Sequence, residues 1–199
     1  MASDELVLGF DTSAAHCAAA LLYNGQIVAS GATEMLKGQS EALGPLIKDL
    51  LVSQNFPINR VTRIGVGIGP GNYTGTRVSV SFARGLSLAL GRPAFGISSF
   101  EATYFGHNEP AHVIVPATGE RIYVQSYPKT SDVIWIGSEK EMDFSSAKRL
   151  DRCSGQRLSE NIAHIASQRS FIDVSPPIPL YVKPADAAPT REQPPKILQ

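Results

Sequence analysis

The sequence contains few of the residues that form disulfides or metal sites. Its 199 residues include two cysteines, Cys17 and Cys153, which lie far apart and outside any CxxC pair. This usage is typical of a reduced compartment, so we expect a cytoplasmic protein. The histidines are His16, His107, His112 and His164. None of their spacings is of the HExxH type, which argues against a zinc peptidase.

An excess of charge of one sign is also missing. The chain has 18 Lys and Arg residues and 18 Asp and Glu residues, so its formal net charge is zero and its pI is about 6.9. The protein therefore has no strong overall electrostatic field that would attract nucleic acid, which argues against a stand-alone RNA binder. Binding through a local basic patch remains an alternative.

Long apolar runs are absent as well. No window approaches the roughly 18 apolar residues that a membrane-spanning helix needs, so we expect no membrane association. The opening residues, MASDELVLGF, lack a basic region followed by a long apolar run, so no signal peptide is expected. Apolar residues nevertheless make up 43% of the chain, which is ample for the core of one compact domain or two small lobes.

The most informative stretch runs from residue 64 to residue 95. Residues 64–68 form an apolar run of the length and β-branched content typical of a buried strand. Residues 69–72, GPGN, permit a sharp turn. Residues 73–90 contain no proline and predict a helix of about four or five turns, which Gly91 and Pro93 end. The stretch therefore predicts a strand, a tight glycine loop and a helix.

The glycine loop has two interpretations. Backbone N–H groups and the dipole of a helix N-terminus can hold an anion. The loop is neither a GxxxxGK[ST] motif nor a GxGxxG motif followed by an acidic residue, because Arg77 lies inside the helix and no Lys follows the last glycine. The alternative is that the glycines only let the chain reverse beneath a packed helix.

The helix that follows the loop carries a stripe of small residues. Ser81, Gly85 and Ala89 recur every four positions and therefore share one face. Glycine inside a helix costs about 1 kcal/mol relative to alanine, so a close backbone neighbour often lies at such a position. That neighbour is either a helix of the same chain or a second protein.

The remaining chain predicts an α/β protein. A helix at residues 40–54 has an apolar stripe that includes Leu43, Leu46, Ile47 and Leu50. The other predicted strands are 6–10, 18–23, 26–33, 94–97, 113–116, 122–127 and 133–136, and the short predicted helices are 144–150 and 158–168. A change of character after residue 105 predicts an N-terminal lobe (1–105), a smaller C-terminal lobe (106–186) and a disordered tail (187–199).

Three motifs resemble those of the TsaB (YeaZ) family. They are GPGNYTGTRVSVSFARGLSLALGRPAFGISSFEA, Asp11-Thr12-Ser13, and YVKPADA at residues 181–187. The resemblance implies an actin-like ATPase (ASKHA) fold of two lobes with mixed sheets flanked by helices. It assigns these residues to the family loop motif: Gly69, Pro70, Gly71, Tyr73, Thr74, Gly75 and Arg77.

The resemblance also implies a function and its partners. Members of this family pair with TsaD, alongside TsaE, to support transfer of a threonylcarbamoyl group to N6 of adenosine 37 in tRNAs that read codons beginning with A. The chain would be a non-catalytic partner, a homodimer in isolation, that meets tRNA only through the complex. The interface residues that we predict are Leu43, Leu46, Ile47, Leu50, Arg77, Ser81, Gly85 and Ala89.

The metal site of the catalytic relative TsaD has no counterpart in this sequence. Where TsaD has two metal-binding histidines, this chain has Ser99 and Thr103, whose neutral hydroxyls are poor substitutes for imidazole. We therefore expect no metal or cofactor on this chain alone, with ATP and a metal ion held by the partner.

Two enzymatic alternatives stay open at this point. An actin-like ATPase would use Asp11, Thr12 and Ser13 as a weak nucleotide site, although these residues also form good local hydrogen bonds in a turn. A peptidase of Ser-His-Asp type stays open because folding alone brings such residues together, but the missing GxSxG motif argues against it.

Overall fold

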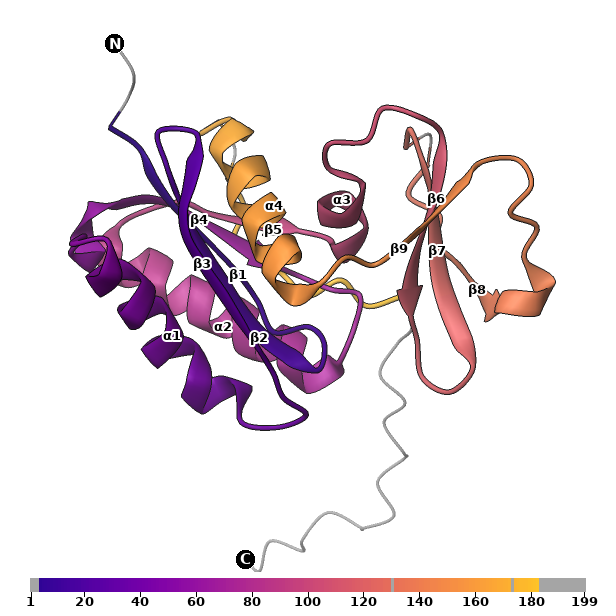
Figure 1. The fold of residues 1–199 in the computed structure, drawn as a ribbon, viewed down its shortest axis with the longest axis horizontal. Coiled ribbons are helices and arrows are strands. Elements are labelled where there is room, and N and C mark those ends of the chain that lie inside the picture. The colour runs from indigo at the N-terminus through magenta and orange to yellow at the C-terminus, as the bar shows by residue number, and fades with distance from the viewer. Residues whose placement is uncertain (1–3, 130, 173, 183–199) are drawn as a thin grey trace, which may run out of the picture.

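The protein is described by a computed structural model that covers residues 4–129, 131–172 and 174–182. Figure 1 shows two sheets with helices packed against them. The strands are β1 (Leu6–Asp11), β2 (His16–Tyr23), β3 (Gln26–Glu34), β4 (Val61–Gly67), β5 (Ala94–Ile97), β6 (Ala111–Pro116), β7 (Arg121–Tyr127), β8 (Trp135–Ser138) and β9 (Lys148–Asp151). The helices are α1 (Gln39–Ser53), α2 (Tyr73–Leu90), α3 (Ser99–Tyr104) and α4 (Gly155–Gln168), with short 3₁₀ turns at Ile58–Arg60 and Glu139–Glu141.

The first sheet has five strands in the order β3-β2-β1-β4-β5. β1, β2 and β3 are antiparallel neighbours, whereas β4 runs parallel to β1 and β5 runs parallel to β4. Asn24 and Gly25 both have positive φ, as the two-residue turn between β2 and β3 requires. The strands predicted at 18–23 and 26–33, and the strand, loop and helix of residues 64–95, are confirmed.

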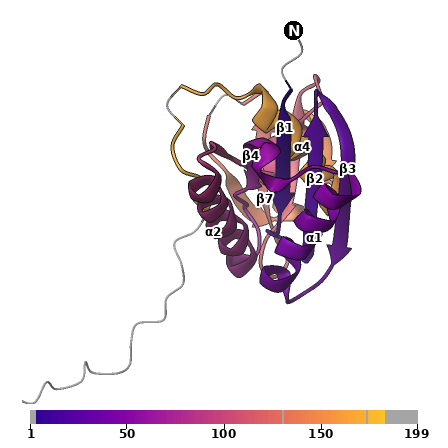
Figure 2. The same ribbon diagram turned by 90° about the vertical axis from the view of Figure 1, so that its left-hand side faces the viewer.

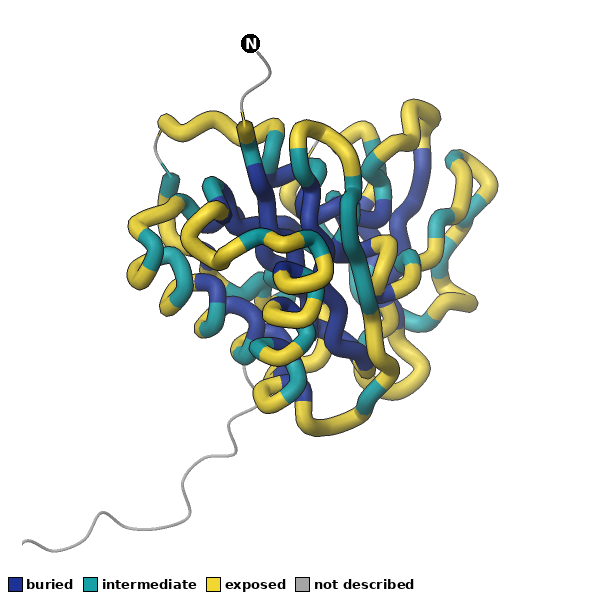
Figure 3. The backbone as a smooth tube through the Cα atoms, turned by 60° about the vertical axis from the view of Figure 1, so that its left-hand side comes forward, coloured by how far each residue is buried: buried dark blue, intermediate teal, exposed yellow. Residues whose placement is uncertain are grey.

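Alternating side chains of β1 place one helical layer on each face of this sheet. Leu6, Leu8 and Phe10 lie in a core cluster with the buried side chains of α1 and α2. Val7 lies in a second cluster with the buried side chains of α4. Figure 2 shows α1 and α2 side by side over the near face, and Figure 3 shows buried strand segments in dark blue behind helical turns with exposed outer sides. A helix pair therefore covers one face and a single helix covers the other.

The second sheet has four strands in the order β8-β7-β6-β9. Phe100 of α3 packs with Val113 and Val115 on one face, and Trp135 packs against the cluster on the other. The predicted strand at 133–136 begins two residues later, at Trp135. The predicted helix at 144–150 is wrong: residues 148–151 form β9, which pairs in parallel with β6.

Residues beyond the second sheet return to the first one. The sequence placed residues 106–186 in one smaller lobe, but α4 lies against β1, β2 and β4. The predicted tail at 187–199 lies outside the described residues.

Candidate association surface

The glycine loop packs directly on the turn that follows β1. Asn72 caps α2 by accepting a hydrogen bond from the Gly75 backbone N–H at 2.9 Å. The Thr12 hydroxyl donates to the Gly75 carbonyl at 2.7 Å, and the Asn72 N–H donates to the Ser13 carbonyl at 2.5 Å. The first of these two bonds joins a side chain to a backbone carbonyl 63 positions away, and the second joins the two backbones directly.

Two glycines of the loop are required by this close approach. A Cβ atom at Gly71 would lie 2.1 Å from the Ser13 carbonyl oxygen, and one at Gly75 would lie 2.0 Å from the Thr12 carbonyl oxygen. No side chain fits at such distances. The packing interpretation of the loop therefore accounts for both glycines without an anion.

Asp11, the acidic residue of the same turn, has internal partners. Its Oδ2 accepts hydrogen bonds from the Ser13 N–H at 3.0 Å and the Ser13 hydroxyl at 2.9 Å, and lies 2.7 Å from His16 Nε2. Asp11, Thr12 and Ser13 are fully buried, and His16 is buried beside them. The bonds of Oδ2 fit the local hydrogen-bonding interpretation of the turn, whereas Oδ1 is buried without a hydrogen-bond partner among the described residues.

Ser99 and Thr103, which the sequence resemblance aligns with the metal-binding histidines of TsaD, also have internal contacts. The Ser99 hydroxyl donates to the Pro70 carbonyl at 3.3 Å, and the Thr103 hydroxyl lies 3.8 Å from the sulfur of Cys153. Both side chains are buried. Within residues 4–129, 131–172 and 174–182, no three His, Cys, Asp or Glu side chains are grouped in a way that could hold a metal ion.

The predicted interface residues of α1 lie on the side of the helix that faces the first sheet. Leu43 is fully buried and Ile47 is 3% exposed, and both belong to the core cluster beneath α1. Leu46 and Leu50 are half-buried and face Gly31 of β3. We therefore correct the prediction for Leu43 and Ile47, because these two side chains are buried against the chain's own sheet.

The predicted interface residues of α2 lie on its outer side. Arg77, Ser81, Gly85 and Ala89 are all exposed. A Cβ atom built at Gly85 would have no neighbouring atom within 4 Å. Among the described residues, therefore, no helix packs on this stripe. A helix from that part of the chain is excluded as the close neighbour of Gly85.

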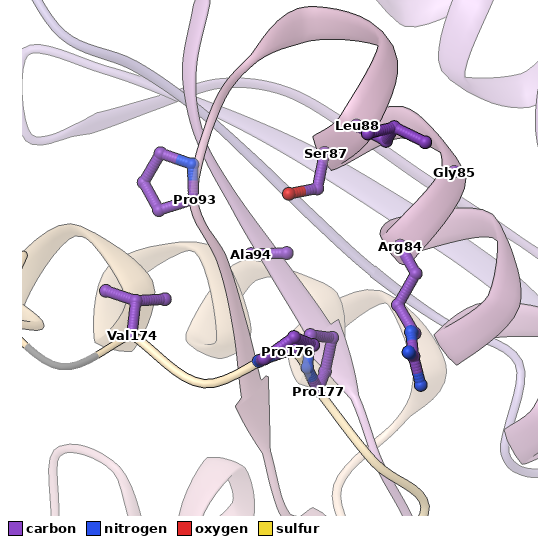
Figure 4. Close-up of a pocket in the computed structure, with 9 residues that line it drawn as sticks. All are labelled: Arg84, Gly85, Ser87, Leu88, Pro93, Ala94, Val174, Pro176 and Pro177. Atoms are coloured by element: carbon purple, nitrogen blue, oxygen red, sulfur yellow. The ribbon is translucent and has the colours of Figure 1, made fainter.

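Exposed apolar groups and hollows flank the stripe. Leu88 of α2 is 87% exposed and Val52 of α1 is 63% exposed. A hollow of about 380 Å³ lies between the two helices, with Phe82 and Leu86 among its lining residues. A second hollow of about 540 Å³ separates Arg84 and Leu88 of α2 from the proline segment at Pro176 and Pro177 (Figure 4). These features together make the outer side of α2 the candidate association surface.

One part of this surface was missed by sequence reasoning. Tyr181 returns to the start of α2, where its hydroxyl accepts a hydrogen bond from Arg77 Nε at 2.8 Å. The YVKPADA motif marked this segment without indicating what it contacts. Its contact with α2 joins residues 104 positions apart.

Comparison with known proteins identifies the family. The family model described as "TsaD: tRNA N6-adenosine threonylcarbamoyltransferase" matches residues 33–134, just over half of the chain. The tRNA threonylcarbamoyladenosine biosynthesis protein TsaB of Buchnera aphidicola subsp. Schizaphis graminum is 28% identical over 142 residues, which are 69% of this chain and 67% of that protein. TsaB of Escherichia coli is 26% identical over 159 residues, 75% of this chain and 68% of that protein.

The chain belongs to this family, in its TsaB (YeaZ) branch. Two solved structures from Pseudomonas aeruginosa share the fold. An uncharacterized protein with similarity to peptidase YEAZ superposes with a TM-score of 0.74 at 19% identity, covering 90% of this chain and all of that one. A YeaZ structure gives 0.69 at 20% identity, covering 89% and 100%. The predicted family and the predicted α/β actin-like fold are confirmed.

Among the residues described here, none of the helices is long and apolar enough to cross a membrane.

Proposed function

We propose that this chain serves in tRNA threonylcarbamoyladenosine biosynthesis as a non-catalytic partner subunit of a TsaD protein. The names of its TsaB relatives support the pathway. The observation that carries the partner role is the open face at Gly85, where a glycine inside an exposed helix has no neighbour. A glycine costs helix stability, so its use here fits a position where another backbone approaches from outside.

The exposed apolar groups beside Gly85 support the same role. Leu88 is almost fully exposed, and apolar side chains also line the hollow between α1 and α2. Apolar surface of this kind is commonly covered by a partner protein. In isolation a second copy would cover it, which gives a homodimer.

The chemistry belongs to the partner in this proposal. TsaD would hold ATP and a metal ion and transfer the threonylcarbamoyl group to N6 of adenosine 37, with TsaE as a further component and tRNA reached through the complex. The enclosed Asp11 turn and the buried hydroxyls of Ser99 and Thr103 fit a subunit that supports this reaction without performing it.

Replacing Gly85 with leucine tests the partner role. We expect the variant to fold, because the position is open, and to bind TsaD at least about tenfold more weakly, because the side chain holds the partner helix away. Affinity is measured by calorimetry with purified TsaD, and folding by circular dichroism.

The matched control is Gln168→Leu at the exposed end of α4, which covers the opposite face of the first sheet. It adds the same apolar group and should bind TsaD normally. Wild-type protein that forms no complex with TsaD at micromolar concentration, or a Gly85→Leu variant that binds as the wild type does, would contradict the proposed role.

A further inference from the structure

Three side chains form a compact cluster at the start of α2. The Arg77 guanidinium lies 3.8 Å from the centre of the Tyr73 ring and donates from Nε to the Tyr181 hydroxyl at 2.8 Å. The two tyrosine rings are 5.3 Å apart and inclined by 34°. We call Tyr73, Arg77 and Tyr181 the Arg77 cluster. Each of its members is exposed, so the cluster is a surface feature with a defined geometry.

The C-terminal segment, residues 174–182, fixes this geometry. The Leu180 N–H donates to the Ile68 carbonyl at 2.8 Å, directly before the glycine loop. This bond holds Tyr181 next to the first turn of α2, where it orients the Arg77 guanidinium. Arginine and tyrosine are enriched among the residues that dominate binding at protein interfaces, and preorganised side chains lose less conformational freedom on binding.

The Arg77 cluster has unused binding capacity. Arg77 donates from Nε to Tyr181, and no carboxylate of the described residues pairs with its two terminal nitrogens. The hydrogen bond to Tyr181 raises the pKa of Arg77 further above its usual value, so the group stays charged. A guanidinium held in this way presents a planar fork that matches a carboxylate.

Charge along α2 favours a partner of different sequence. The helix carries Arg77 and Arg84 and no acidic residue. Neither arginine forms an ion pair with any residue in the described parts of the chain. A homodimer that paired the α2 helices of two copies would bring four like charges together and would therefore be the weaker complex, whereas an acidic partner helix would neutralise these charges.

We propose that the Arg77 cluster anchors the partner of α2 by binding a carboxylate side chain that a TsaD subunit, and not a second copy of this chain, presents. The inference rests on the proposed function. It adds the chemistry of the contact and a role for the C-terminal segment, because Tyr181 positions Arg77 for that carboxylate.

The test uses charge reversal in the full chain. Arg77→Glu should weaken TsaD binding at least about tenfold, because it places like charges opposite each other. Arg77→Lys should weaken it less, and Tyr181→Phe should weaken it by about twofold to fivefold through loss of the orienting hydrogen bond. The wild-type affinity should fall as salt rises, and the Arg77→Glu variant should lose that dependence. Affinity is measured by calorimetry at two salt concentrations.

Self-association and an unrelated arginine provide the controls. Sedimentation of the protein alone should show that Arg77→Glu leaves self-association unchanged or strengthens it. Arg121→Glu makes the same charge change at an exposed position of β7 in the second sheet and should bind TsaD as the wild type does.

The outcomes separate this inference from the proposed function. If TsaD binds the wild type and Arg77→Glu equally well, or if Arg121→Glu is as damaging as Arg77→Glu, the Arg77 cluster is not the anchor, although the partner role stands. Equal weakening of self-association and TsaD binding by Arg77→Glu would show that a second copy also uses the cluster. A wild-type protein that does not bind TsaD would overturn both proposals.

Discussion

Alanine at Gly75 should destabilise the protein by about 3 kcal/mol, even though alanine is normally the better helix former. Its Cβ atom would lie 2.0 Å from the Thr12 carbonyl oxygen, so the glycine loop and the turn after β1 have to separate. The Thr12–Gly75 and Asn72–Ser13 hydrogen bonds would be lengthened or lost as a result. Because the chain has 199 residues, a loss of this size should lower the melting temperature by about 6–12 °C.

Gly85 in the same helix is the matched control for this experiment. A Cβ atom there has no neighbour within 4 Å, so Gly85→Ala should raise the free energy of unfolding by about 0.5–1 kcal/mol. Urea denaturation of both variants measures the difference. Two glycines of one helix would then respond with opposite signs, and a Gly75→Ala variant as stable as Gly85→Ala would disprove the close approach of the two segments.

Removal of the Asp11 carboxylate should cost about 3–5 kcal/mol of unfolding free energy. The side chain is fully buried, and its loss in Asp11→Ala leaves the Ser13 N–H, the Ser13 hydroxyl and His16 Nε2 without their acceptor. Unsatisfied buried donors are costly because they have lost water without gaining a partner. The predicted effect is therefore on stability, and it is measured by chemical denaturation.

Two further variants separate this network from a general effect of charge. Asp49→Ala removes an exposed carboxylate of α1 and should change stability by less than about 0.5 kcal/mol. A double-mutant cycle that combines Asp11→Ala with His16→Ala should give a coupling of about 1–3 kcal/mol, because the two side chains are in direct contact. A stable Asp11→Ala variant that has lost an ATPase activity of the isolated chain would instead favour the enzymatic alternative.

The sequence predicted the first sheet well because its signals are local. The Asn24-Gly25 turn, the apolar strands and the glycine loop are each specified by neighbouring residues, and the structure agrees with them. The helix expected at 144–150 failed for the opposite reason. Residues 148–151 become β9 because they pair with β6, more than 35 positions earlier, and pairing over that distance overrides local propensity.

The candidate site was predictable only in part. Small residues at Ser81, Gly85 and Ala89 indicated a line of close approach without deciding between a helix of the same chain and a second protein, and in the structure this stripe is exposed. The apolar stripe of α1 does not indicate whether it packs on the sheet or on a partner protein. The prediction therefore places Leu43 and Ile47 at the interface, whereas both are buried against the sheet. The contact of Tyr181 with Arg77 depends on where the chain returns after α4, which no local pattern encodes.

The position of α4 has a consequence for how the polypeptide matures on the ribosome. One face of the first sheet is covered by residues 155–168, although its strands are complete by residue 97. The ribosome must therefore translate α4 before the apolar side chains on this face can be covered. These side chains include Val7, Leu22, Phe95 and Ile97. A nascent chain of this kind is a natural client for chaperones, and premature termination before α4 would leave an aggregation-prone fragment with an open apolar sheet.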